Sequence, residues 1–199
     1  MKYEIFSHRH AIEIAKNNSD YKSEFEEIIK VLDFISDEDI INEFKKSKYS
    51  NNKSISRCIN QLIKDALIKL NWKDESPIFQ DERYSNNRFR LDFAKEKFSV
   101  EVAFNHGEAI SWNLLKPVLS GELNHIKKAI QTKIGVIIFA TDGMKKTGGF
   151  DGAVGSYEKA LRYLNIMMNQ LTTPLIIIGL SEPETFCINK GELIKNSFI

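Results

Sequence analysis

Two kinds of apolar spacing along the chain predict its secondary structure. Residues 22–35 and 56–70 carry apolar side chains three and four positions apart, the spacing of an amphipathic helix. Residues 134–140 and 174–180 are unbroken apolar runs rich in β-branched residues, which is typical of strands buried on both faces. Two further helices are predicted, over residues 109–130 with interruptions near Pro117 and Gly121, and over residues 156–170.

Residues 88–106 alternate apolar and polar side chains in two stretches that are joined by a four-residue turn. Side chains alternate across a strand, so this pattern predicts a hairpin with one wholly apolar face. That face is formed by Phe89, Leu91, Phe93, Phe98, Val100, Val102 and Phe104. The order of elements is helices, hairpin, helix, strand, helix and strand, which predicts an α/β protein with a mixed central β-sheet flanked by helices.

Composition and charge are those of a globular protein without an overall basic charge. With 199 residues, of which 42% are hydrophobic and 28% charged, the chain is predicted to form a single domain over residues 1–199. The net charge of +1 creates no overall basic field, but Arg83, Arg88 and Arg90 gather beside the hairpin. The chain has no apolar signal segment and no stretch near the roughly 20 apolar residues that span a bilayer. We therefore expect a cytoplasmic protein without membrane contact.

A pair of carboxylates lies on the polar face of the hairpin. Asp92, near the end of the first predicted strand, and Glu101, inside the second, point to the same side and can meet. Such oxygen ligands suit Mg²⁺, an ion that can activate water and neutralise charge on a phosphodiester. Alternatively, both are surface carboxylates paired with Arg90 and Lys95. Burying acids without a counter-ion is costly and a metal supplies one, so the pair favours a metal-dependent nuclease.

Residues 141–155 (TDGMKKTGGFDGAVG) are rich in glycine and are predicted to form a long loop, which makes them a functional candidate. Neither a G-x-G-x-x-G motif nor a Lys-Ser/Thr pair at P-loop spacing is present, which disfavours nucleotide binding. A loop that approaches a DNA backbone is the other interpretation. In that case Lys145 and Lys146 would contact phosphates.

The hairpin also resembles a known family. Asp92-Phe93 followed by Val100-Glu101-Val102 is similar to the D-F and V-E-V core of BglII-like and BstYI-like type II restriction endonucleases, within the PD-(D/E)xK nuclease superfamily. The likeness covers residues 1 to about 182. It implies a restriction-endonuclease-like fold and a Mg²⁺-dependent homodimer that cleaves double-stranded DNA at a short palindromic site.

The same resemblance implies roles for individual residues. Asp92 and Glu101 would be the metal ligands, and Glu75 a further catalytic acid that helps position the water shell of the metal. The chain departs from the family at Ala103, where relatives carry Gln and the wider superfamily Lys or Glu, a group that orients or activates the attacking water. We expect Ala103 to face the same cleft as Glu101. Another side chain then replaces the missing group, or metal-bound water suffices, or activity is weak or lost; the candidate replacements are Lys95, Lys97, Asn105 and His106.

Two segments correspond to the base-reading regions of the family. Asn105 and His106 follow the second strand of the hairpin, and Asn can pair with adenine while His can donate to guanine acceptors. Residues 150–153 form the second region, but they lack the Asn-Ser pair expected of a BglII-like reader, so the target sequence stays open. Arg88 and Arg90 would contact phosphates beside the acids.

The sequence therefore predicts a type II-like restriction endonuclease. One alternative is a DNA-binding protein that has kept the nuclease scaffold with weakened catalysis, which Ala103 motivates. Another is a repair or recombination nuclease of the same superfamily. A degenerate nuclease would be expected to lose its acids, and this chain keeps both, which favours an enzyme.

Overall fold

A mixed β-sheet forms the centre of the molecule. The computed structural model describes residues 1–46, 51–84, 87–123 and 125–195, and among these residues six strands form one sheet in the order β1-β6-β5-β4-β3-β2. β4, β5 and β6 run parallel, whereas β1, β3 and β2 pair antiparallel with their neighbours. The strands are β1 (Tyr3–His8), β2 (Lys73–Pro77), β3 (Arg90–Lys95), β4 (Phe98–Val102), β5 (Ile134–Ala140) and β6 (Leu175–Leu180). The predicted mixed sheet is confirmed.

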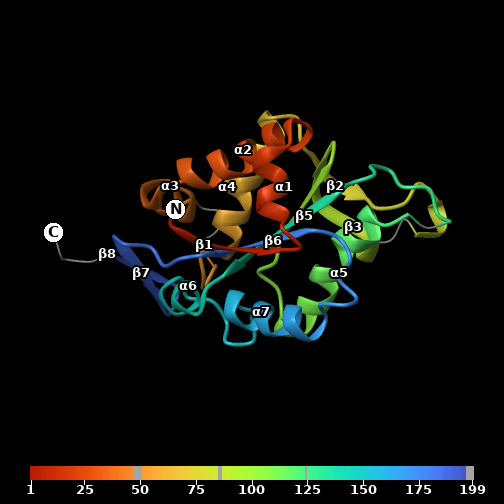
Figure 1. Ribbon diagram of the computed structural model, residues 1–199. Coiled ribbons are helices and arrows are strands. Elements are labelled where there is room, and N and C mark those ends of the chain that lie inside the picture. Colours follow the sequence, from red (N-terminus) through yellow and green to blue (C-terminus); the bar gives the residue numbers. More distant parts are fainter. Residues whose placement is uncertain (47–50, 85–86, 124, 196–199) are drawn as a thin grey trace.

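Helices cover both faces of this sheet, as Figure 1 shows. One face is covered by α1 (Ala11–Asn17), α2 (Ser19–Phe34), α3 (Asp37–Phe44) and α4 (Ser56–Lys69). The opposite face carries α5 (Ile110–Gly121) and α7 (Tyr157–Ile166). The α/β class with flanking helices is therefore also confirmed.

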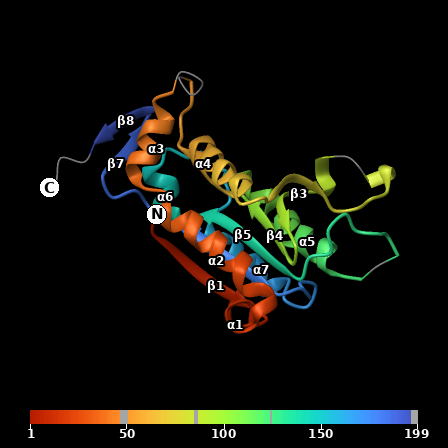
Figure 2. The ribbon, with the colours of Figure 1, turned by 90° about the horizontal axis from the view of Figure 1, so that it is seen from above.

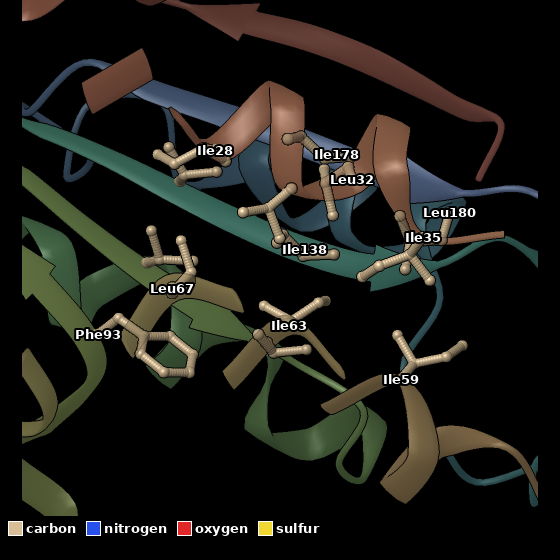
Figure 3. Close-up of a cluster of buried hydrophobic side chains, with 14 of the residues drawn as sticks. Ile28, Leu32, Ile35, Ile59, Ile63, Leu67, Phe93, Ile138, Ile178 and Leu180 are labelled. Carbon is tan, nitrogen blue, oxygen red and sulfur yellow. The ribbon is translucent and has the colours of Figure 1, made fainter. Parts of the chain in front are cut away.

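β5 is apolar at every position because it is buried on both of its faces. Ile138 faces α2 and α4, where it packs in one cluster with Ile28 and Leu67 (Figure 3). Its neighbour Phe139 belongs instead to the cluster that contains Leu114 of α5. Alternate residues of a strand point to opposite faces, so a strand with a core on both sides needs apolar residues at every position.

α5 packs tightly against β5 of the sheet. Pro117 lies inside the helix rather than interrupting it, and the helix predicted over 109–130 ends at Gly121. A Cβ atom added to Gly135 of β5 would clash with the Cβ of Pro117. Only a glycine on β5 therefore allows the helix to pack at this distance.

The stretch predicted as one long loop, residues 141–155, begins with a short helix. α6 (Asp142–Thr147) starts at Thr141, whose Oγ1 accepts a hydrogen bond from the backbone N–H of Met144 at 3.1 Å. This cap, which outweighs the glycines of the segment, places Lys145 and Lys146 on a helix, so their predicted loop position is wrong. The described residues also form the hairpin of β7 (Phe186–Asn189) and β8 (Glu192–Lys195) and the 3-10 helices η2 (Glu82–Tyr84), η3 (Asn87–Phe89) and η4 (Gly107–Ala109).

Residues 78–80 and 127–129, which are distant in sequence, are joined by backbone hydrogen bonds at one side of the sheet (Figure 2). We call these two segments and the side chains packed on them the arm. The backbone N–H of Ala129 donates to the carbonyl of Ile78 at 3.0 Å, and that of Gln80 donates to the carbonyl of Lys127 at 2.9 Å. Phe89 packs edge to face against Phe79 within this arm. No helix within the described part of the chain is long and apolar enough to cross a membrane.

Candidate active site

The structure brings the two predicted acids together where β3 and β4 part. The register pairs Phe93 with Val100 and Ala94 with Ser99, so Asp92 and Glu101 occupy the next pair of positions. Phe93 and Val100 point into the core under α2 and α4. Strand alternation therefore directs both acids to the opposite face, which α5 covers.

Each acid has a defined hydrogen-bond partner. Asp92 is half-buried, and its Oδ2 accepts a hydrogen bond from the backbone N–H of Val102 at 2.7 Å. Glu101 is only 1% exposed, and its Oε2 pairs with the ammonium of Lys116 on α5. Its other oxygen, Oε1, is buried and has no hydrogen-bond partner among the described residues. One carboxylate oxygen is thus available to a further ligand.

Burial makes this pair of carboxylates costly to ionise. Burial raises the pKa of Glu101 well above its usual range, the charge of Asp92 raises it further, and Lys116 acts in the opposite direction. Burial also raises the pKa of Asp92, against the opposing effects of the Lys116 charge and the Val102 N–H. With both carboxylates ionised, the site would carry more negative charge than one lysine can balance.

These residues fit a divalent cation. Hard oxygen ligands from carboxylates are those that Mg²⁺ prefers, and Glu101, whose Oε1 is unpartnered, is close enough to Asp92 for the charge of that acid to raise its pKa. No group of three or more His, Cys, Asp or Glu side chains that could hold a metal occurs in the described part of the chain. Asp92 and Glu101 are the residues that would hold such a cation.

A cavity of about 330 Å³ opens beside Asp92. Glu75 and Asn105 line it, as does Asp74, which pairs with Lys64 at 2.7 Å. The register of β2 and β3 places Glu75 opposite Asp92, because Asp74 pairs with Phe93 and Ser76 with Leu91. Glu75 is exposed and has a left-handed backbone with a φ of 45°, which is uncommon outside glycine. It therefore lies on the cavity wall without joining Asp92 and Glu101 in a group of three acids.

The expectation that Ala103 faces the cleft is wrong. Ala103 is 2% exposed and belongs to the same buried cluster as Ile110 and Leu114. Alternation was predicted correctly, since Ala103 lies on the same face as Glu101, but α5 folds back over that face directly after η4. Lys95 is also excluded as a replacement, because its Nζ donates to Glu27 and to the carbonyl of Leu70 on the other side of the sheet, both at 2.8 Å.

The two segments predicted to read bases lie side by side. The backbone N–H of Gly155 donates to the carbonyl of Asn105 at 2.9 Å, and that of Gly107 donates to the carbonyl of Ala153 at 2.7 Å. His106 forms a β-bridge with Val154 between these bonds. We call this paired region, residues 105–107 with 151–155, the rim. Its side chains at Asn105, His106, Asp151 and Ala153 are exposed.

The predicted phosphate contacts lie on two sides of the site. Lys145 donates from its Nζ to the carbonyl of Gly152 at 3.3 Å, so it also supports the rim, while Lys146 is exposed. Arg88 is exposed in η3, and its carbonyl accepts a hydrogen bond from the Trp112 indole at 3.1 Å. Arg90 is half-buried at the start of β3.

Two polar residues of α5 complete the site and were missed from the sequence. Asn113 donates from its Nδ2 to the Oδ1 of Asn105 at 2.9 Å, and Lys116 pairs with Glu101. The two lie three positions apart, on one face of the helix. The signal in the sequence was a single lysine within the apolar run LLKPVL, residues 114–119, where a buried cation needs an acidic partner.

Comparisons with known proteins identify the family and the fold. The sequence model of the family described as Restriction endonuclease BglII/BglIII matches residues 3–180. A search of curated proteins gives no match. The crystal structure of restriction endonuclease BglII complexed with a DNA 16-mer is similar with a TM-score of 0.67 and 24% identity, over 94% of this chain and 80% of that chain. Free BglII is similar with a TM-score of 0.54 and 21% identity, over 94% of this chain and 83% of that chain.

Proposed function

The chain belongs to the restriction endonuclease BglII/BglIII family and is thus a site-specific deoxyribonuclease, and we propose that it cleaves double-stranded DNA at a short palindromic site with Mg²⁺. The observation that carries the proposal is the pair Asp92 and Glu101 with the unpartnered Oε1 of Glu101. A buried and a half-buried carboxylate that share one lysine need a further positive charge when both are ionised, and a divalent ion supplies it.

In this proposal Asp92 and Glu101 hold the metal. When bound, the ion lowers the pKa of a coordinated water and neutralises charge that develops on the phosphate. The protein positions its own groups: the Val102 N–H fixes the orientation of Asp92, and Lys116 fixes that of Glu101.

The rim and the basic residues around the site are proposed to bind DNA. Asn105 and His106 would contact base edges, whereas Arg88, Arg90, Lys145 and Lys146 would contact phosphates. A palindromic site has two-fold symmetry, so we propose that the active form is a homodimer whose two-fold axis coincides with that of the DNA. Each subunit would then cleave one strand.

The test is incubation of the protein with phage DNA and Mg²⁺. We expect discrete fragments that are absent with EDTA, and the fragment ends give the site and the stagger. Degradation without discrete fragments would instead favour a repair or recombination nuclease. Specific binding in Ca²⁺ without cleavage in Mg²⁺ or Mn²⁺ would favour the second candidate, a DNA-binding protein with weakened catalysis, which the alanine at position 103 motivates.

A further inference from the structure

Lys116 is a buried lysine that contacts one of the two acids of the site, Glu101. Its side chain is 11% exposed, and its ammonium pairs with the Oε2 of Glu101, whose side chain is 2% exposed. Burying a charged ammonium is costly without a partner, and Glu101 is that partner. The charge of Lys116 also reaches Asp92, because it opposes the rise in the pKa of that carboxyl.

The small residues around α5 make this position of Lys116 possible. Ala103 packs in the cluster of Ile110 and Leu114, and Gly135 lies under Pro117, one residue after the lysine. A longer side chain at either site would push α5 away from the sheet. The small side chain of Ala103 therefore has a structural consequence. It allows α5 to pack close enough to the sheet for Lys116 to reach Glu101.

We propose that Lys116 supplies from α5 a positive charge to a site that has no polar side chain at position 103, and that this charge acts on the phosphodiester. The inference rests on the proposed function. With the two carboxylates ionised, the lysine and a divalent ion bring the net charge of the site to +1, which one phosphodiester neutralises. Without Lys116 the loaded site is neutral and does not attract the anionic substrate.

Charge arithmetic also predicts opposite effects on two measurable quantities. Removing the ammonium leaves two carboxylates without compensation, so the protein alone should bind a divalent ion more tightly. The same change removes the positive charge that we propose acts on the phosphodiester, so cleavage should slow. A lysine with a merely structural role would not shift metal affinity and cleavage in opposite directions.

The experiment compares Lys116→Met and Lys116→Arg with wild type. Mn²⁺ binding to the protein alone is measured by calorimetry, and cleavage as a single-turnover rate at saturating DNA and Mg²⁺. For Lys116→Met we expect Mn²⁺ affinity to rise several-fold and the rate to fall on the order of 10²-fold, the loss typical of removing one group that stabilises charge in the transition state. Lys116→Arg keeps the charge and should restore most of the rate with wild-type Mn²⁺ affinity.

Lys128 provides a matched control, because it is also a buried lysine but lies over the ring of Phe79 in the arm. Lys128→Met should leave Mn²⁺ affinity unchanged. If Lys116→Met does not fold, Lys116→Gln, which keeps a hydrogen-bond donor without the charge, replaces it. A Lys116→Met rate near that of wild type, or Mn²⁺ affinity that is unchanged or falls, would overturn the inference. If wild type cleaves no DNA, the proposed function fails, while calorimetry still decides the coupling between Lys116 and the metal.

Discussion

The carboxylate of Asp92 accepts a hydrogen bond from the backbone N–H of Val102 at 2.7 Å, across the point where β3 and β4 separate. Backbone pairing between these strands extends only to Phe93 and Val100. Beyond that pair, the side chain of Asp92 rather than its backbone makes the hydrogen bond that connects β3 to β4. The first acid is thus anchored to the strand that carries the second, Glu101.

Asp92→Asn tests the charge of Asp92 alone, because this substitution removes the charge but can keep the hydrogen bond to Val102. The amide oxygen of asparagine can still accept from the Val102 N–H, but the ionised metal ligand is lost. We expect cleavage to fall to background while the melting temperature stays close to that of wild type. Asp92→Ala removes both functions and should also destabilise the protein by about 1–3 kcal/mol.

The measurements for Asp92 are DNA cleavage in Mg²⁺ and thermal unfolding followed by circular dichroism. Asp74→Asn is a suitable control, because Asp74 lines the same cavity but pairs with Lys64. Its cleavage rate should stay close to that of wild type. Cleavage by Asp92→Asn at the wild-type rate would show that Asp92 holds no metal.

The raised pKa of Glu101 predicts how the stability of the metal-free protein depends on pH. The folded-state pKa lies above the unfolded one, so folding takes up protons between the two values. The contribution of Glu101 is fully present below the usual carboxyl range and is lost as pH rises through the folded-state pKa. The free energy of unfolding, measured in urea with EDTA, should fall over this window.

Glu101→Gln should remove most of this pH dependence, because the amide does not titrate. A saturating divalent ion should also flatten it, since the ion favours the ionised carboxylates. Asp92 contributes in the same direction, because its pKa is raised as well. Equal slopes for wild type and Glu101→Gln in EDTA would mean that Glu101 is not the group responsible.

Placing Gln at position 103, the residue that the resemblance to the family implies there, should destabilise this protein. Ala103 is packed among Ile110 and Leu114, so the side chain of Ala103→Gln must displace α5. Overpacking a well-packed core costs about 1–3 kcal/mol, and we expect a loss of this size in urea unfolding. Ala153→Gln, at an exposed position of the rim, is the control and should change stability little. A variant at 103 that is as stable as wild type and cleaves faster would show that α5 yields easily.

If the rim reads bases, substitutions in it should change sequence specificity, whereas substitutions of phosphate-binding lysines should change overall DNA affinity. His106 is exposed and held by the bridge to Val154, so His106→Ala should weaken binding to the cognate site by about 1–3 kcal/mol for each base edge that the imidazole reads. Binding to random DNA should change far less. Asn105→Ala should act similarly, although it also leaves Asn113 without its partner.

Lys146→Ala should instead weaken cognate and random DNA alike, and should reduce the salt dependence of binding by about one counter-ion. Lys146 is the better choice than Lys145, because Lys145 also donates to the Gly152 carbonyl. Competition binding in Ca²⁺ at two salt concentrations distinguishes the two effects. If the ratio of cognate to random affinity stays constant in the Asn105 and His106 variants, these residues do not read bases.

The sequence by itself determined which side of the hairpin the acids occupy. A strand repeats every second residue, so the apolar residues around Asp92 and Glu101 decide the face of both acids without reference to the rest of the chain. The same local logic predicted the two-sided burial of β5 and the flanking helices. The resemblance in the D-F and V-E-V segments then indicated the family to which the chain belongs.

Only the tertiary structure decided what covers that face. The packing of α5 buries Ala103 and brings Lys116 to Glu101, and no periodicity within the hairpin contains this information. Likewise, backbone hydrogen bonds join Asn105 and Gly107 to a segment that follows almost fifty residues later. Local spacing determines the direction of a side chain, whereas its partner depends on how distant elements pack, and that packing is set by the whole core.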